Sequence, residues 1–96
     1  LRMTMSIPAE RMKRLHVLAR EAVATGKKAR ARSYVKLARR IGERNRISLP
    51  RQFRRFSCDN CDIYLRPAKT ARVRLQPGHV VIRCLECGAT KRYPHE

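Results

Sequence analysis

All four cysteines of the chain fall into two Cys-x-x-Cys pairs in its C-terminal half, and this arrangement constrains the fold more than any other feature. Two cysteines three positions apart can place both sulfur atoms on one ion if the backbone between them turns tightly, and two such turns form a closed tetrahedral site. Four protein ligands leave no open position for water or substrate, so the site is structural. The predicted ligands of one Zn²⁺ are Cys58, Cys61, Cys84 and Cys87.

The residue that follows each pair differs in its fit to such a turn. Gly88 follows the second pair and readily takes the positive φ that the turn usually needs. Asp62 follows the first pair and fits less well, although aspartate tolerates positive φ better than most residues. Two disulfide bonds are the main alternative, and four cysteines allow three pairings. The sequence shows no secretory signal, so we expect a zinc site in a cytoplasmic protein.

The length and charge of the chain limit the functions that it can have. A chain of 96 residues buries only a modest fraction of its surface, so its fold is expected to need further stabilisation. A structural zinc ion, with a binding free energy of about 10 to 16 kcal/mol, would supply it. The 24 Lys and Arg against 7 Asp and Glu give a formal net charge of +17, which favours a polyanionic partner. No membrane anchor is expected, because the longest aliphatic run, residues 80–82, is far shorter than the roughly 20 apolar residues that span a bilayer.

The N-terminal half has the apolar periodicity of two helices. The first is expected over about residues 8–25, with Ser6 as its N-cap, Pro8 in its first turn and Gly26 at its end. The second is expected over about residues 28–46. Because the connection between them is so short, the two helices are predicted to be antiparallel neighbours in a hairpin.

The apolar stripes of this hairpin have two interpretations. About half of the positions must form the internal core. Two helices alone cannot bury much, so the rest is expected to be covered by the C-terminal half or by another protein. The many alanines allow close helix approach but fill little volume, so we expect the outer edge to dock a partner protein. The candidate partner-binding residues are Met12, Leu15, Leu18, Ala19, Ala22, Leu37, Ala38 and Ile41.

The C-terminal half is predicted to be a zinc ribbon that is joined to the hairpin by residues 50–57. Phe53 and Phe56 lie one helical turn apart in this joint and are expected to pack between the two halves, with base stacking as the functional alternative. Alternating residues 71–75 and a Pro-Gly turn then predict a β-hairpin with an aliphatic face and an arginine face. Residues 63–66 and 90–93 are expected to add strands.

The predicted fold is therefore a small, metal-stapled α+β protein. Residues 1–49 form an antiparallel helical hairpin, and residues 50–96 form a zinc ribbon with four cysteine ligands. The basic residues of the joint and ribbon are predicted to form one continuous surface that recognises folded RNA by its shape and backbone, although a single charge is usually only solvated. The candidate RNA-binding residues are Arg51, Arg54, Arg55, Arg72, Arg74, Lys91 and Arg92.

Catalysis by this chain has little support. The sequence contains no evident nucleophile and base pair and no Gly-rich phosphate loop, so no catalytic residue and no small-molecule substrate are predicted. His16, His79 and His95 are dispersed, and none is expected to bind the metal.

Several runs of the sequence have the pattern of one known family. The C-terminal half contains Phe-Arg-Arg-Phe at residues 53–56, Ala-Arg-Val-Arg at 71–74, His-Val-Val-Ile-Arg-Cys-Leu-Glu-Cys-Gly at 79–88 and Lys-Arg-Tyr-Pro at 91–94. The helical run at residues 34–41 is similar too. With these runs the chain resembles archaeal ribonuclease P protein component 4 over nearly its whole length.

The resemblance implies an L-shaped protein with two helices in one arm and a zinc ribbon in the other. It implies membership of ribonuclease P, the ribonucleoprotein whose RNA, with Mg²⁺, removes the 5′ leader of precursor tRNA. It also implies that the helices bind ribonuclease P protein component 1, a small β-barrel protein, and that the pair supports the specificity domain of the RNA. The chain departs from the family at Asp62, where a glycine is expected, and at residues 66–70, where the loop is expected to contain more glycine. A zinc-ribbon protein that binds ribosomal RNA or belongs to the transcription machinery is the competing hypothesis.

Overall fold

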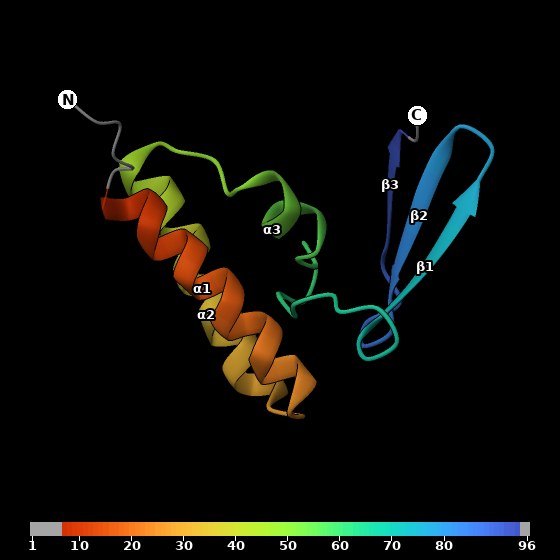
Figure 1. Cartoon of the computed structure of the whole chain (residues 1–96), viewed down its shortest axis with the longest axis horizontal. Helices are drawn as coiled ribbons and strands as arrows, with labels where there is room; N and C mark the ends of the chain where they lie inside the picture. The colour runs from red at the N-terminus through yellow and green to blue at the C-terminus, as the bar shows by residue number, and fades with distance from the viewer. Residues whose placement is uncertain (1–6, 95–96) are drawn as a thin grey trace.

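The computed structural model describes residues 7–94, so the predicted N-cap Ser6 and the histidine His95 lie outside the described residues. Figure 1 shows two long helices side by side in one arm and a small sheet in the other, with a short helix between them. The predicted order of a helical hairpin followed by a ribbon is confirmed. The elements are α1 (Ile7–Ala24), α2 (Lys28–Asn45), α3 (Arg51–Arg55), β1 (Ala71–Gln76), β2 (His79–Cys84) and β3 (Thr90–Pro94).

The two long helices end where the backbone turns into the left-handed region. After α1, Gly26 has φ 78°, and the N–H of Lys27 donates to the carbonyl of Ala22 at 2.7 Å. After α2, Arg46 has φ 55°, and its N–H donates to the carbonyls of Glu43 and Gly42. Both turns satisfy carbonyls that the helix itself leaves unpaired. Within residues 7–94 no helix has the length and apolar character that crossing a lipid bilayer requires.

Small residues bring α1 and α2 close together. Ala19, Ala31 and Ala38 are fully buried between the helices. Gly42 has no room for a side chain, because a Cβ there would lie 2.7 Å from the carbonyl oxygen of Ile47 and 2.9 Å from the side chain of Met12 on α1. The alanines noted in the sequence therefore serve the internal helix contact.

The joint between the arms is built on stacked aromatic rings. Phe53 has no exposed surface, and its ring stacks on that of His16 with centroids 4.7 Å apart and planes 3° apart. The Nε2 atom of His16 in turn lies 2.8 Å from the hydroxyl of Tyr64. The expectation that the two phenylalanines pack at the joint is confirmed for Phe53, and Phe56 packs against the same core while only half-buried. His16 is the residue of α1 that contacts both Phe53 and Tyr64.

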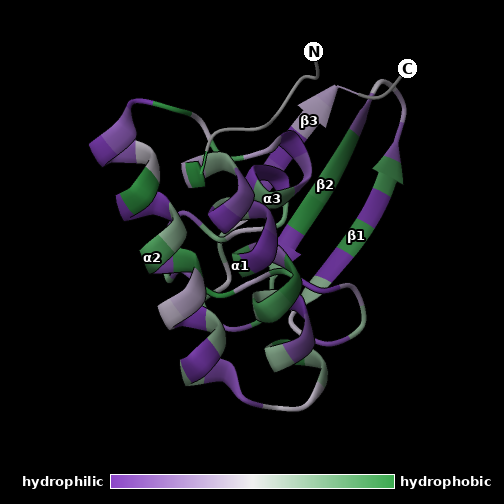
Figure 2. Cartoon of the chain, turned by 60° about the vertical axis from the view of Figure 1, so that its left-hand side comes forward, coloured by the Kyte–Doolittle hydropathy of each residue, from purple (hydrophilic) through white to green (hydrophobic). Residues whose placement is uncertain are grey.

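The sheet has the order β1-β2-β3, with both pairs antiparallel. Gly78 in the β1–β2 turn has φ 82°, as the predicted Pro-Gly turn requires. Figure 2 shows hydrophobic and hydrophilic residues alternating along β1, whereas β2 is largely hydrophobic. On the aliphatic face of β1, Ala71 is buried in the core, whereas Val73 is 39% and Leu75 is 71% exposed.

The strand predicted over residues 63–66 is wrong. Only isolated bridges occur there, between Ser57 and Tyr64 and between Pro67 and Ala71. The side chains at 63–65 are all buried, and the Thr70 hydroxyl donates to the carbonyl of Tyr64 at 2.6 Å. This segment therefore crosses the core with its polar backbone groups paired locally, whereas an edge strand would expose alternate side chains.

Candidate functional site

The four cysteines converge on one point. Their Sγ atoms all lie within 4.8 Å of one another, with 3.5 Å between Cys58 and Cys87 and 3.7 Å between Cys61 and Cys84. Sulfur atoms about 2.3 Å from a tetrahedral Zn²⁺ would be about 3.8 Å apart, whereas a disulfide needs about 2.05 Å. All four cysteines are free thiols, so the disulfide alternative is wrong, and the geometry fits one metal ion.

Two equivalent backbone turns place these sulfur atoms. The N–H of Asp62 donates to the carbonyl of Cys58 at 3.0 Å, and the N–H of Gly88 donates to that of Cys84 at 2.9 Å. Asp62 and Gly88 have φ values of 64° and 84°, so both positions take the predicted conformation. Asp62 offsets its less favourable backbone with its carboxylate, which accepts a hydrogen bond from Arg39.

Helix α2 holds both cysteine turns from one side. At the first turn, Arg39 also donates to the carbonyl of Cys58 at 3.2 Å. At the second, Glu86 pairs with Lys28 at 2.8 Å and with Arg32 at 3.6 Å, and the hydrogen bond from Lys28 lowers the pKa of the Glu86 carboxyl. These contacts fix the orientation of the ribbon relative to the hairpin.

The thiols differ in their surroundings. Burial raises the pKa of Cys84 to about 12 and also raises the pKa of Cys58, whereas a hydrogen bond from Asn60 lowers the pKa of Cys87 to about 6. The protein alone therefore keeps the two buried thiols protonated at neutral pH. A bound cation would deprotonate them, as metal thiolates require.

The candidate RNA-binding arginines lie on two sides of the sheet. Strand register places Arg72 beside Arg83, and Arg74 in line with Val81 and Arg92, so these arginines share one face. All four are exposed, and we call them the arginine face. Arg83 was missed, although its position two residues after Val81 follows the same alternation. The burial of Val81 between Arg74 and Arg92 is consistent with cover from their aliphatic stems.

The remaining candidates lie near the joint, on the other side of the sheet. Arg51 and Arg54 are exposed on α3, and the guanidinium of Arg55 lies 4.8 Å from the ring centroid of Tyr93. Tyr93 pairs with Val80 and so points away from the arginine face. The continuous basic surface predicted from the sequence is therefore divided by the sheet.

The ammonium of Lys91 is engaged in contacts within the protein. Its side chain is only 13% exposed, and its ammonium donates to the carbonyls of Arg54 and Ser57, both at 2.8 Å. The same ammonium lies 3.5 Å from a carboxylate oxygen of Asp59. These contacts cap α3 and join β3 to the first cysteine turn, which leaves Lys91 poorly placed to contact RNA.

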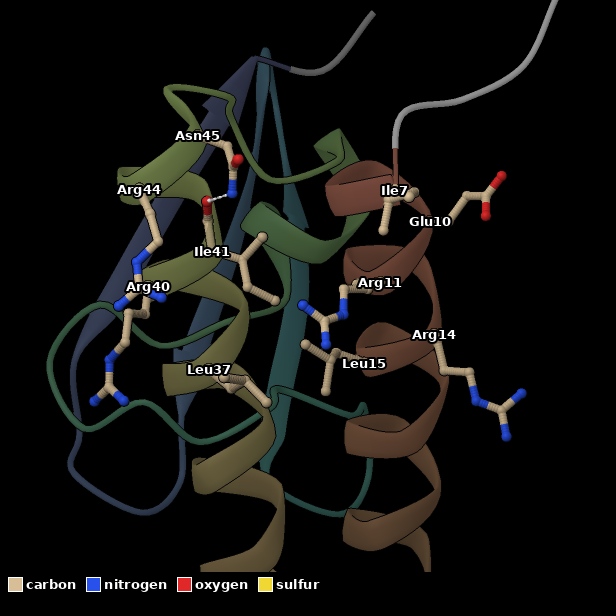
Figure 3. A pocket seen from close by; sticks show the side chains of 10 residues that line it. All are labelled: Ile7, Glu10, Arg11, Arg14, Leu15, Leu37, Arg40, Ile41, Arg44 and Asn45. Atoms are coloured by element: carbon tan, nitrogen blue, oxygen red, sulfur yellow. Dashed lines mark hydrogen bonds between the residues drawn. The ribbon is translucent and has the colours of Figure 1, made fainter.

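A groove of about 530 Å³ runs between α1 and α2 on the outer side of the hairpin. Figure 3 shows Leu15, Leu37 and Ile41 directed into it from both helices. The side chain of Arg11 also extends into the groove, whereas Arg14, Arg40 and Arg44 point outward. Leu37 is 44% exposed, so the floor is apolar and open to solvent. The rim residues, which the sequence prediction left out, are Glu10, Arg11, Arg14, Arg40 and Arg44.

The other predicted partner-binding residues do not line this groove. Met12, Ala19, Ala22 and Ala38 are buried between the helices, which makes them core in this structure. Leu18 is half-buried in a separate, smaller depression. A periodic apolar stripe marks the buried side of a helix, but it does not say which members remain accessible.

The family model of the RNAse P Rpr2/Rpp21/SNM1 subunit domain matches residues 11–88. The chain belongs to this family. Ribonuclease P protein component 4 of Halobacterium salinarum is 59% identical over 90 residues, covering 94% of this chain and 96% of that protein. The protein of the same name from Methanosarcina acetivorans is 42% identical over 91 residues, covering 95% and 84% of the two chains.

Solved structures of family members have the same fold. A chain in the cryo-EM structure of archaeal ribonuclease P with mature tRNA matches with a TM-score of 0.89 and 41% identity, covering 99% of this chain and 82% of that one. The Pfu Rpp21 structure matches with a TM-score of 0.64 and 36% identity, covering 90% and 97%. The resemblance seen in the sequence is confirmed, and the family favours a ribonuclease P subunit over a ribosomal or transcription protein.

Proposed function

We propose that the chain is an RNA-binding protein subunit of ribonuclease P that supports catalysis by the RNA component and has no active site of its own. The observation that carries the proposal is the fold similarity, along almost the whole chain, to a subunit of archaeal ribonuclease P with mature tRNA. A formal charge of +17 supports an RNA partner. Because such a subunit takes part in the maturation of precursor tRNA, we expect the protein to act in the cytoplasm.

The metal in this proposal is one structural Zn²⁺. Four thiolate donors and sulfur separations of 3.5 and 3.7 Å suit zinc, which favours closed tetrahedral sulfur sites. Zinc would supply folding free energy and no reaction chemistry. Its ligands would be Cys58, Cys61, Cys84 and Cys87.

The arginine face is the proposed contact with the RNA backbone. Its four guanidiniums are exposed, and none of them forms an ion pair within the described residues. Guanidiniums make forked contacts with phosphate, and no base-reading motif is evident among residues 7–94, which favours recognition of RNA shape. The RNA partners are the specificity domain of ribonuclease P RNA and its complex with precursor tRNA.

The helical groove is the proposed contact with a protein partner, ribonuclease P protein component 1. Its apolar floor at Leu15, Leu37 and Ile41 would take aliphatic side chains. Four arginines and a single acidic residue on the rims favour a partner segment that carries carboxylates. The two contacts lie on different arms, so one chain can bind both partners at once (Figure 1).

Reconstitution tests this function. Precursor tRNA cleavage is measured at limiting Mg²⁺ with ribonuclease P RNA, with this chain, with the partner protein and with all three together. The expected result is stimulation that requires both proteins and no cleavage without the RNA. Cleavage by the chain alone, or no effect of the chain on the RNA-catalysed reaction, contradicts the proposal.

A further inference from the structure

A second concave site lies at the joint, where α1, α3 and the segment after the first cysteine turn meet. Its volume is about 460 Å³. It is separate from the arginine face and from the groove between the helices. The residues that matter for its chemistry are His16, Arg20, Gln52, Phe56, Tyr64 and Arg66.

The site is positively charged and contains no carboxylate in its lining. The guanidinium of Arg66 donates to the backbone carbonyl of Arg20 at 3.4 Å, which holds the Arg66 side chain against α1 at the edge of the cavity. Within residues 7–94 neither arginine forms an ion pair. Two arginines that line one cavity without a carboxylate beside them provide a site for an external anion.

The effects on neighbouring groups agree with this charge. Burial raises the pKa of the Tyr64 hydroxyl, and the charges of Arg20 and Arg66 oppose that change. Burial and the charge of Arg20 both lower the pKa of His16. His16 and Tyr64, which form the floor of the site, are therefore uncharged at neutral pH, and Arg20 and Arg66 make the electrostatic potential of the site positive.

The site also has an aromatic wall and a rigid floor. Phe56 is only half-buried, and unlike Phe53 it has no ring partner among the described residues. The hydrogen bond between His16 and Tyr64 fixes the floor. The side-chain amide of Gln52 adds a donor and an acceptor at the edge. A partly accessible ring beside two arginines is an arrangement that can bind a base and its phosphate together.

We propose that this joint site binds one unpaired nucleotide of RNA, with its phosphate between Arg20 and Arg66 and its base against Phe56. The inference rests on the proposed function, because it names the kind of RNA element that an RNA-binding subunit would take here. It assigns Phe56 the stacking role and leaves Phe53 in the core. A flat apolar wall favours a nucleotide over a free anion, which would use only the arginines.

The test uses the full-length, metal-loaded chain and a single-stranded RNA hexamer that contains one 2-aminopurine. Anisotropy gives the dissociation constant, and quenching of the 2-aminopurine reports stacking. Arg20→Gln with Arg66→Gln should weaken binding at least 10-fold, as expected for the loss of two charged contacts. Arg30→Gln with Lys36→Gln removes the same charge from the exposed side of α2 and should change binding by less than about threefold.

Phe56→Leu keeps an apolar side chain but removes the stacking surface. It should abolish the quenching and weaken binding by roughly 5- to 150-fold, the range for loss of one base stack. Thermal unfolding shows whether this variant is folded, and the arginine pair tests the site if it is not. Equal effects of the two charge-matched pairs, or inorganic phosphate that binds as tightly as the hexamer, would overturn the proposal. If the chain stimulates ribonuclease P while these variants behave like wild type, the nucleotide site fails and the subunit function stands.

Discussion

Replacing Arg39 with methionine tests whether α2 holds the metal site. Arg39 bonds to the Asp62 carboxylate and to the carbonyl of Cys58, and its third contact, with the largely exposed Asp59, adds little. Charged hydrogen bonds contribute about 1.5 to 3 kcal/mol each when well formed, and these are partly exposed, so we expect a loss of about 2 to 3 kcal/mol in all. Methionine keeps much of the packing of the arginine stem. For a domain of this size the melting temperature should fall by about 10 to 20 °C.

The measurement is thermal and urea unfolding of the metal-loaded protein, followed by circular dichroism. Arg40→Met is the matched control, because Arg40 is the next residue, is exposed and makes no hydrogen bond or ion pair among the described residues. The Arg39 variant should also lose its metal faster to a chelator, since Asp62 would hold its positive φ without its partner. Equal stability of the two variants, within about 0.5 kcal/mol, would refute the role of α2 in fixing the site.

Three further predictions concern the rest of the fold. Removing the metal with a strong chelator should unfold residues 57–94. The amide NMR signals of these residues should lose their dispersion, and added Zn²⁺ should restore it. An unchanged spectrum would contradict a stabilising role of the metal. Gly42→Ala should destabilise the protein by about 1 to 3 kcal/mol in urea, because the added Cβ meets the carbonyl of Ile47 at 2.7 Å; a gain in stability, as helix propensity alone predicts, would show the site to be open. Burial keeps the folded-state pKa of His16 below 6.5, so the unfolded chain binds the proton more readily and stability should fall as pH drops through 6.5 and below. His16→Phe, which cannot titrate, should flatten that pH dependence relative to wild type, and an identical slope would contradict the assignment.

The metal site could be read from the sequence because its determinants are local. The spacing of the two cysteine pairs and the residues after them specify the turns, and Asp62 adopts the positive φ that was expected of it. The helical hairpin is local in the same way, since its apolar period and the glycine at 26 define both helices and the turn between them. Family membership was inferred from short runs of the sequence, and the match to the family model confirmed it.

The functional surfaces could be predicted only in part, because they depend on which elements face each other. The alternation of β1 placed Arg72 and Arg74 on one face, but nothing local to the sequence showed that Lys91 would turn inward to cap α3. The apolar stripe of α1 did not show which residues α2 would cover. His16, dispersed in the sequence, proved to link Phe53 to Tyr64 across the joint.

The cysteine cluster, the two helices, the β-hairpin and the family were therefore predictable from the amino-acid sequence, because backbone turns and hydrophobic periods are encoded by neighbouring residues. The division of the arginines by the sheet, the apolar groove between the helices and the concave site at the joint became visible only in the folded chain. Each of these surfaces is formed by side chains from segments far apart in the chain, and their approach depends on the packing of the whole core around Phe53.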